Sequence, residues 1–327
     1  MKRNGPLRAL ALLILSIGIA TTADATEPCV FERSACPRNC PAAESVGAFS
    51  RWLGRPIQRA SDYAGGATWN EIAAHAFNKA KYWHRHRPRW PLVLAVAMLP
   101  SDGASSLERG AAGDYDAPLQ SIARSIVAAG ATDAEIRLGW EFNGNWFEWR
   151  ASSSPNAFVM FWRRSVGAMR AVSGARFTFN WNLSLGGHAV APDQVYPGDA
   201  YVDAIGLDFY NFGSPDEQSD KRWQGYASRP YGLDWLATFA SDHRKPLTVP
   251  EWGTGQMADA RSGGGDDPQF IERSVRWFGS HSVRYACYFD ADQPGSFQTR
   301  ISDNSKPRSA QVLRRLFAGV PSAPGAQ

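Results

Sequence analysis

The sequence predicts a single α/β domain with the (β/α)8 TIM-barrel fold, and three observations support it. Strand-like runs alternate with helical patterns through most of the 327 residues. Several runs are continuously apolar, as in 92–97, which indicates strands that are buried on both faces of a parallel sheet. The chain beyond residue 25 is about 300 residues long, and such a barrel typically takes about 250.

Residues 1–25 have the pattern of an export signal peptide. A basic start precedes a short apolar stretch at 9–20, and a small-residue cleavage pattern follows at 23–25. The apolar stretch is too short to span a bilayer. We therefore expect a secreted or periplasmic protein that is cleaved near Ala25 and free of the membrane afterwards. The alternative is a retained N-terminal anchor.

Net charge and aromatic content indicate which kinds of molecule the protein binds. The formal net charge of +4 falls to about +2 after cleavage, because the leader carries three basic residues and one acidic residue. A nearly neutral chain gives no support for a nucleic-acid partner. Aromatic residues make up 12% of the chain and include 13 Trp, an excess that suits stacking on the sugar rings of a polysaccharide or oligosaccharide.

Four cysteines indicate disulfides in an exported chain: Cys29, Cys36, Cys40 and Cys287. Four thiols allow three pairings, and the sequence does not choose between them. We favour one local bridge among the first three and one from that segment to Cys287. A metal site is the alternative, but the spacing is not that of a zinc site and no histidine lies nearby, so no metal is predicted.

Seven strand-like runs and a weaker first run near Val30 supply the eight strands. The runs are 57–63, 92–98, 135–141, 176–182, 204–210, 247–252 and 284–290. A doubly wound open sheet is the competing architecture, but no G-x-G-x-x-G motif follows an early strand.

Helices are expected between most of these strands, and the domain is expected to span 26–318. Asp116 is positioned as an N-cap for 117–129, and two glycine-rich segments, 101–114 and 260–267, are expected as loops over the active face. The tail 319–327 is expected to fray. The other predicted helices are 68–84, 155–172 and 267–280.

Two glutamates end predicted strands, Glu141 on the fourth and Glu251 on the seventh. In a barrel the carboxyl ends of all strands meet on one face, where the active site lies. A carboxylate among indole rings is costly to keep unless the site uses it. Two carboxyls that face one bond are what glycoside hydrolysis requires.

Three segments resemble glycoside hydrolase family 26, which contains β-mannanases and their relatives. Residues 137–149, Arg-Leu-Gly-Trp-Glu-Phe-Asn-Gly-Asn-Trp-Phe-Glu-Trp, resemble the motif of its fourth strand. Residues 196–210 are similar to its sixth-strand region, and Pro-Glu-Trp-Gly at 250–253 resembles its nucleophile strand. The matches follow the family's order across about 135–255.

The resemblance implies that Glu141 is the general acid/base and Glu251 the nucleophile. The expected protein is a retaining endo-glycoside hydrolase that cleaves β-mannan or a similar β-glycan by double displacement without a cofactor. The acid needs a raised pKa, for which Trp140 and Trp146 are expected to form an apolar wall. The nucleophile needs hydrogen-bond donors, which we expect from Tyr210 by resemblance and from Arg137 by position.

Further residues are candidates for binding the substrate. The sequence leaves alternatives open for some of them: a buried ion pair for Arg137, a turn cap for Asn143, and core positions for Trp146 and Trp149. The full set is Arg137, Trp140, Asn143, Trp146, Trp149, Asp208, Tyr210 and Trp252.

The sequence departs from the family in two places, which keeps other functions open. Trp140 stands where the family usually has His, and the last strand lacks a Trp that Tyr288 or Phe289 would replace. The rival functions are a glycanase that acts on a bacterial exopolysaccharide, a catalytically inert carbohydrate-binding barrel, and a scaffold with no sugar site. The sequence contains no H-E-x-x-H, G-x-S-x-G or P-loop motif.

Overall fold

The computed structural model describes residues 26–31, 42–214, 216–257, 262–293 and 295–318. The predicted leader, Cys36, Cys40, the tail and part of the predicted loop 260–267 lie outside the described residues.

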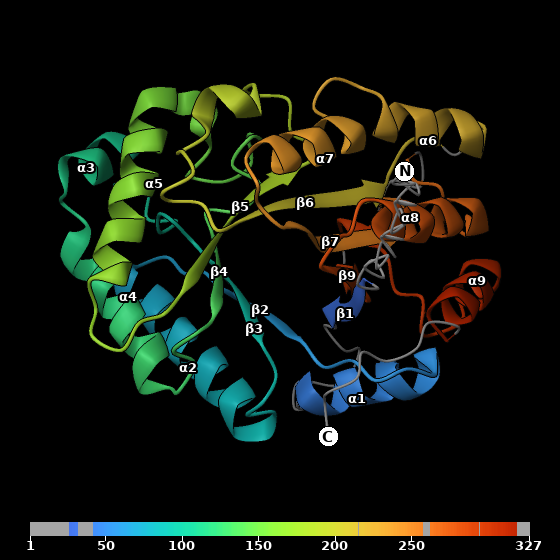
Figure 1. Cartoon of the computed structure of the whole chain (residues 1–327), viewed down its shortest axis with the longest axis horizontal. Coiled ribbons are helices and arrows are strands. Elements are labelled where there is room, and N and C mark those ends of the chain that lie inside the picture. The colour runs from blue at the N-terminus through green and yellow to red at the C-terminus, as the bar shows by residue number, and fades with distance from the viewer. Residues whose placement is uncertain (1–25, 32–41, 215, 258–261, 294, 319–327) are drawn as a thin grey trace, which may run out of the picture.

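Eight parallel strands with intervening helices form a nearly closed barrel, as predicted, and the helices lie around the outside of the strands (Figure 1). The strands are hydrogen-bonded in the order β1-β9-β7-β6-β5-β4-β3-β2. They are β1 (Glu27–Phe31), β2 (Ala60–Ala64), β3 (Leu92–Val96), β4 (Glu135–Leu138), β5 (Thr178–Ser184), β6 (Ala204–Asn211), β7 (Leu247–Thr254) and β9 (Tyr285–Phe289).

Three two-residue strands make a small antiparallel sheet from the segments that follow β7 and β9. They are β8 (Gln256–Met257), β10 (Asp292–Gln293) and β11 (Phe297–Gln298), in the order β10-β11-β8. This sheet was not predicted, because two-residue strands carry no hydrophobic period.

The helices agree with the sequence pattern except at two places. Asp116 is the first residue of its helix rather than the N-cap, and it pairs with Arg164 at 2.8 Å. The predicted loop 101–114 contains a short helix, which Ser106 caps by accepting the N–H of Arg109. The helices are α1 (Ala42–Leu53), α2 (Trp69–His86), α3 (Leu107–Ala112), α4 (Asp116–Ala128), α5 (Pro155–Arg170), α6 (Ser219–Ala227), α7 (Leu233–Asp242), α8 (Pro268–Ser280) and α9 (Pro307–Ala318).

The seam between the first two strands of the barrel is held by charge and stacking. Arg59, directly before β2, pairs with Glu27 of β1 at 2.7 Å. Its guanidinium also lies 4.5 Å from the ring centroid of Tyr285, a cation–π geometry. β1 and β2 therefore stay together at the point where the hydrogen-bonded order ends.

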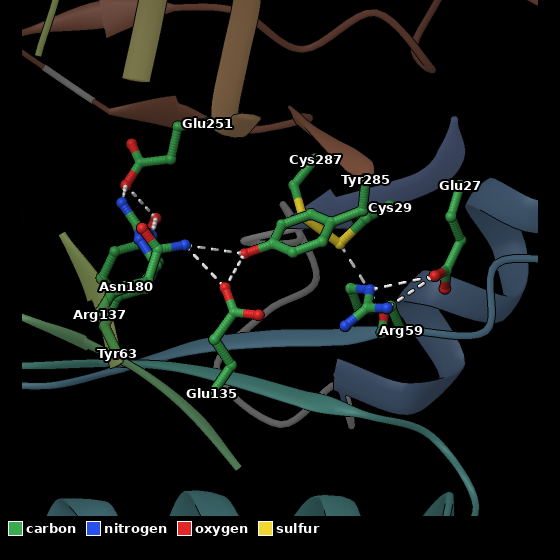
Figure 2. The surroundings of a disulfide bond; sticks show 10 residues. All are labelled: Glu27, Cys29, Arg59, Tyr63, Glu135, Arg137, Asn180, Glu251, Tyr285 and Cys287. Carbon is green, nitrogen blue, oxygen red and sulfur yellow. Dashed lines mark hydrogen bonds and ion pairs between the residues drawn. A yellow bond between two sulfur atoms is a disulfide. The ribbon is translucent and has the colours of Figure 1, made fainter. Parts of the chain in front are cut away.

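The amino-terminal half of the barrel interior contains a polar network around Glu135 (Figure 2). The buried carboxyl of Glu135 accepts hydrogen bonds from Asn180 Nδ2 at 2.7 Å and from the hydroxyl of Tyr285, and it pairs with Arg284. A buried carboxylate is stable only when its acceptors are filled in this way.

A disulfide between Cys29 and Cys287 joins β1 to β9 next to this network (Figure 2). The two residues are register partners on neighbouring strands, and both are buried. The predicted link from the N-terminal segment to Cys287 is therefore confirmed. The predicted local bridge involves cysteines outside the described residues.

Among the described residues, no helix is both long enough and apolar enough to cross a bilayer.

Removal of this disulfide is expected to destabilise the barrel. It closes a loop with a sequence separation of 258 residues, so Cys29→Ala/Cys287→Ala should lower the free energy of unfolding by about 2–4 kcal/mol and the Tm by several degrees. Thermal unfolding checks this, and scans with and without reductant separate this bond from any bond made by Cys36 or Cys40. An unchanged Tm would contradict the expectation.

Candidate active site

The chain leaves β4 through a sharp turn that presents Glu141. The strand ends at Leu138, earlier than predicted, because Gly139 and Glu141 both have a φ of 54°, in the left-handed region. The N–H of Glu141 donates to the carbonyl of Asn182 at 2.8 Å, which ties the turn to β5. Non-glycine residues in this conformation are uncommon and cluster at functional sites.

Glu251 lies within β7, and its carboxylate accepts three hydrogen bonds. The hydroxyl of Tyr63 and Nη2 of Arg137 donate to Oε1 at 2.6 and 2.7 Å. The hydroxyl of Tyr210 donates to Oε2 at 2.7 Å. Three donors stabilise the ionised carboxylate and fix its orientation. The expected donors, Arg137 and Tyr210, are confirmed.

Arg137 is fully buried beneath the two carboxylates of β6 and β7. Its Nη2 lies 2.6 Å from Oδ2 of Asp208 and 2.7 Å from Oε1 of Glu251, and its Nε donates to Oδ1 of Asn182. A guanidinium without access to water is stable only when it is paired. The structure therefore shows the buried ion pair that the sequence left open.

Three carboxyls share this one guanidinium, so their ionisation is coupled. Burial is the largest influence and raises the pKa of Asp208, while Arg137 lowers it and the charges of Glu251 and Glu141 raise it. A second or third negative charge in one buried cluster is disfavoured by repulsion. At least one of the carboxyls is thereby favoured in its protonated form.

Glu141 has a pKa that is raised into the neutral range. Burial, followed by the negative charge of Glu251, raises the pKa of Glu141 to about 7. Trp146 has the opposite effect from the one expected, because its Nε1–H donates to Oε2 of Glu141 at 2.9 Å and lowers the pKa.

Both glutamates line one cleft of about 1400 Å³. Because Glu141 follows β4 and Glu251 lies in β7, the cleft opens at the carboxyl ends of the strands. The indole of Trp146 is 48% exposed beside Glu141, so one large apolar face is available to a ligand. The other aromatic residues that line the cleft are Phe31, Tyr63, Trp83, Trp140, Phe147, Phe209, Tyr210, Phe212, Tyr226, Phe289 and Phe297.

The structure brings six of the ten predicted site residues to this cleft. They are Trp140, Glu141, Trp146, Asp208, Tyr210 and Glu251. Phe289 also lines the cleft, so of the two residues that could replace the missing Trp of the last strand, Phe289 is the one that reaches it. Tyr288 is buried elsewhere, with its hydroxyl donating to the carbonyl of Thr299 at 3.0 Å.

The other four predicted residues lie behind the cleft wall. Arg137 holds the carboxylates from below, and Asn143 bonds the backbone N–H and carbonyl of Ser184, both at 2.8 Å. Trp149 is buried and donates to the backbone of the turn at 2.8 Å. Trp252 is fully buried and packs towards α8. These side chains shape the site without reaching the cleft.

Tyr63 is the residue that sequence reasoning missed. It ends the predicted strand 57–63 at the same face of the barrel as the glutamates, and this position was the available signal. The hydroxyl contact with Glu251 spans 188 residues of sequence, and no local pattern reveals it.

In the part of the chain that the structure describes, no group of three or more His, Cys, Asp or Glu side chains is arranged to hold a metal ion.

Comparison with known proteins shows a family similarity in the central segment of the chain. The sequence profile of glycosyl hydrolase family 26 matches residues 132–223. Endoglucanase H of Acetivibrio thermocellus is 27% identical over 224 residues, which cover 65% of this chain and 23% of that protein. The chain therefore spans less than a quarter of the length of this curated relative.

Solved structures share the fold at low sequence identity. The catalytic domain of the family 26 endo-β-1,4-mannanase of Bacillus sp. JAMB-750 superposes with a TM-score of 0.61 at 15% identity, over 91% of this chain and 86% of that one. A β-mannanase from a symbiotic protist of the termite Reticulitermes speratus, complexed with gluco-manno-oligosaccharide, gives 0.57 at 13% identity, over 91% and 88%.

The matched segment contains Glu141 and the turn that presents it, and the barrel supplies Glu251 across the same cleft. The central segment of the chain is thus similar to glycosyl hydrolase family 26, and the whole domain shares the fold of that family's solved mannanases.

Proposed function

We propose that this protein cleaves a β-linked polysaccharide inside the chain, with retention of anomeric configuration and by double displacement. The observation that carries the proposal is the contrast between two carboxyls in one cleft. Glu141 has a pKa raised to about 7, whereas Glu251 accepts three hydrogen bonds from Tyr63, Arg137 and Tyr210. One group is prepared to donate a proton and the other to act as an anion.

In the first step Glu251 attacks the anomeric carbon while Glu141 protonates the departing glycosidic oxygen. The bond from the anomeric carbon to the leaving sugar breaks as the bond to the Glu251 carboxylate forms. Arg137 and Tyr210 orient the attacking oxygens. Loss of the Glu251 charge in the covalent intermediate lowers the pKa of Glu141, because the repulsion that raised it disappears.

In the second step the ionised Glu141 accepts a proton from water. The water oxygen then attacks the anomeric carbon, and the ester to Glu251 breaks. Two inversions give net retention. The same carboxyl serves as acid and then as base because its pKa follows the charge on its neighbour.

The leading substrate class is β-mannan or a similar β-glycan. The support is the cleft of about 1400 Å³, which is large enough for several sugar residues and carries the exposed indole of Trp146. The names of the related endoglucanase and endo-β-1,4-mannanases agree with this class. A glycanase for a bacterial exopolysaccharide is the second candidate, favoured by Trp140, which lines the cleft where the family usually has His.

We also propose that the protein is exported, on the pattern of residues 1–25. Amino-terminal sequencing of the protein from the periplasmic and culture fractions tests this. A mature chain that begins after Ala25 supports export, and an intact Met1 in the cytoplasm contradicts it.

Replacement of each glutamate is expected to have a distinct kinetic effect. Glu251→Gln should abolish hydrolysis of every substrate, because no nucleophile remains. Glu141→Gln should slow cleavage of a β-glycan by about 10²–10⁴-fold, but should spare formation of the intermediate from aryl glycosides whose leaving group needs no proton. Burst kinetics and reducing-end release on a glycan panel measure both effects.

The matched control is Glu148→Gln, because Glu148 is an exposed carboxylate on the same loop and should leave the rate unchanged. Proton NMR of the first product decides retention. If Glu251→Gln keeps its activity, or if the product is inverted, the proposed mechanism is wrong. Sugar binding without cleavage by the unaltered protein would favour an inert binding barrel.

The plot of kcat/KM against pH should fall at high pH because Glu141 loses its proton there. Because the acid must be protonated in the free enzyme, kcat/KM should fall about tenfold per pH unit above a pKa of about 7. Trp146→Phe removes the N–H that favours the ionised carboxylate, so it should move this limb to higher pH. A limb that stays in place would show that the Trp146 bond does not act on the titrating group.

A further inference from the structure

Two cationic side chains line the described part of the cleft, Lys79 and Arg229, and they differ in whether a carboxylate pairs with them. Of the described Lys and Arg side chains that line the cleft, Lys79 pairs with Asp62 at 2.9 Å. Arg229, which follows α6, lines the cleft beside Gly213 and Tyr226 and has no carboxylate partner among the described residues. Glu141 and Glu251 give the same cleft its negative charge.

Arg229 is held by a neutral partner. Its Nη2 contacts the imidazole of His188, with Nδ1 at 2.9 Å. Since a guanidinium only donates, the histidine ring must accept. Burial and the charge of Arg229 both lower the pKa of His188, which keeps the ring neutral. His188 therefore orients the guanidinium without neutralising its charge.

The position is costly for a cation that has no counter-ion. Arg229 is partly buried, and this burial lowers its pKa, which means that water solvates its charge incompletely. No acceptor for Nε or Nη1 is found in the described part of the chain, so N–H donors on both sides of Nη2 are available to a ligand. A planar guanidinium fork matches the two oxygens of a carboxylate.

We propose that Arg229 binds a carboxylate carried by the glycan, so that the substrate class is an acidic β-glycan that contains a uronic acid or a carboxylated substituent. This rests on the proposed function as a β-glycan hydrolase. A neutral mannan offers the guanidinium only hydroxyl groups. An acidic glycan both fills the donor fork and offsets the repulsion from the carboxylates of the cleft.

The test compares β-linked oligosaccharides that contain one uronic acid with the same oligosaccharides after carboxyl reduction, so that charge is the only difference. The unaltered protein should give a higher kcat/KM and a lower Kd for the acidic member of each pair. In Arg229→Gln the ratio of the two kcat/KM values should fall by about ten- to a hundredfold, as expected for the loss of one charged pair. Arg229→Lys should retain part of the preference, and salt should weaken it.

Arg124→Gln is the matched control, because it removes the same charge from an exposed position on α4, away from the cleft, and should keep the ratio. If Arg229→Gln lowers both kcat/KM values equally, or changes neither, the inference is overturned. If no oligosaccharide is cleaved, the proposed function fails, but calorimetric Kd values for the acidic and reduced pair still decide the role of Arg229. Equal Kd values for the two would overturn it.

Discussion

The buried guanidinium of Arg137 is the interaction on which the site depends. It lies between Asp208 and Glu251 with no access to water, and its charge opposes the rise in the pKa of Asp208 that burial causes. Removal of one member of such a group typically costs about 3–5 kcal/mol, because it leaves an unpaired buried charge. Strands β4, β6 and β7 are thus held at a fixed spacing, and Glu251 cannot rotate away from the cleft.

The two glutamates acquire different properties from their surroundings rather than from their own chemistry. Glu251 accepts hydrogen bonds from two hydroxyls and one guanidinium. Glu141 is half-buried on a turn and accepts a hydrogen bond from Trp146, and the charge of Glu251 raises its pKa. In the proposed mechanism the same residue type therefore serves as an acid after β4 and as an anion in β7.

The amino-terminal end of the barrel interior contributes stability, and the carboxyl-terminal end forms the site. Near the amino ends of the strands, Glu135, Asn180 and Tyr285 are hydrogen-bonded to one another beside the disulfide (Figure 2). Near the carboxyl ends, Asp208 and Glu251 pair with Arg137 beneath them and also line the cleft. This division is the usual arrangement of the fold, in which strands supply rigidity and the segments after them supply function.

The sequence by itself determined the barrel and the two strands, the fourth and the seventh, with which Glu141 and Glu251 are associated, because hydrophobic period and strand spacing are local properties. It also identified Arg137 as a donor, since alternation along a strand fixes which side chains point inward, whereas Tyr210 was identified by the family resemblance. Only the tertiary structure decided that Tyr63 joins them, that Trp146 donates to Glu141, and that Asn143, Trp149 and Trp252 lie behind the wall. These outcomes depend on contacts between segments far apart in the chain and on the turn at Gly139, which no local pattern encodes.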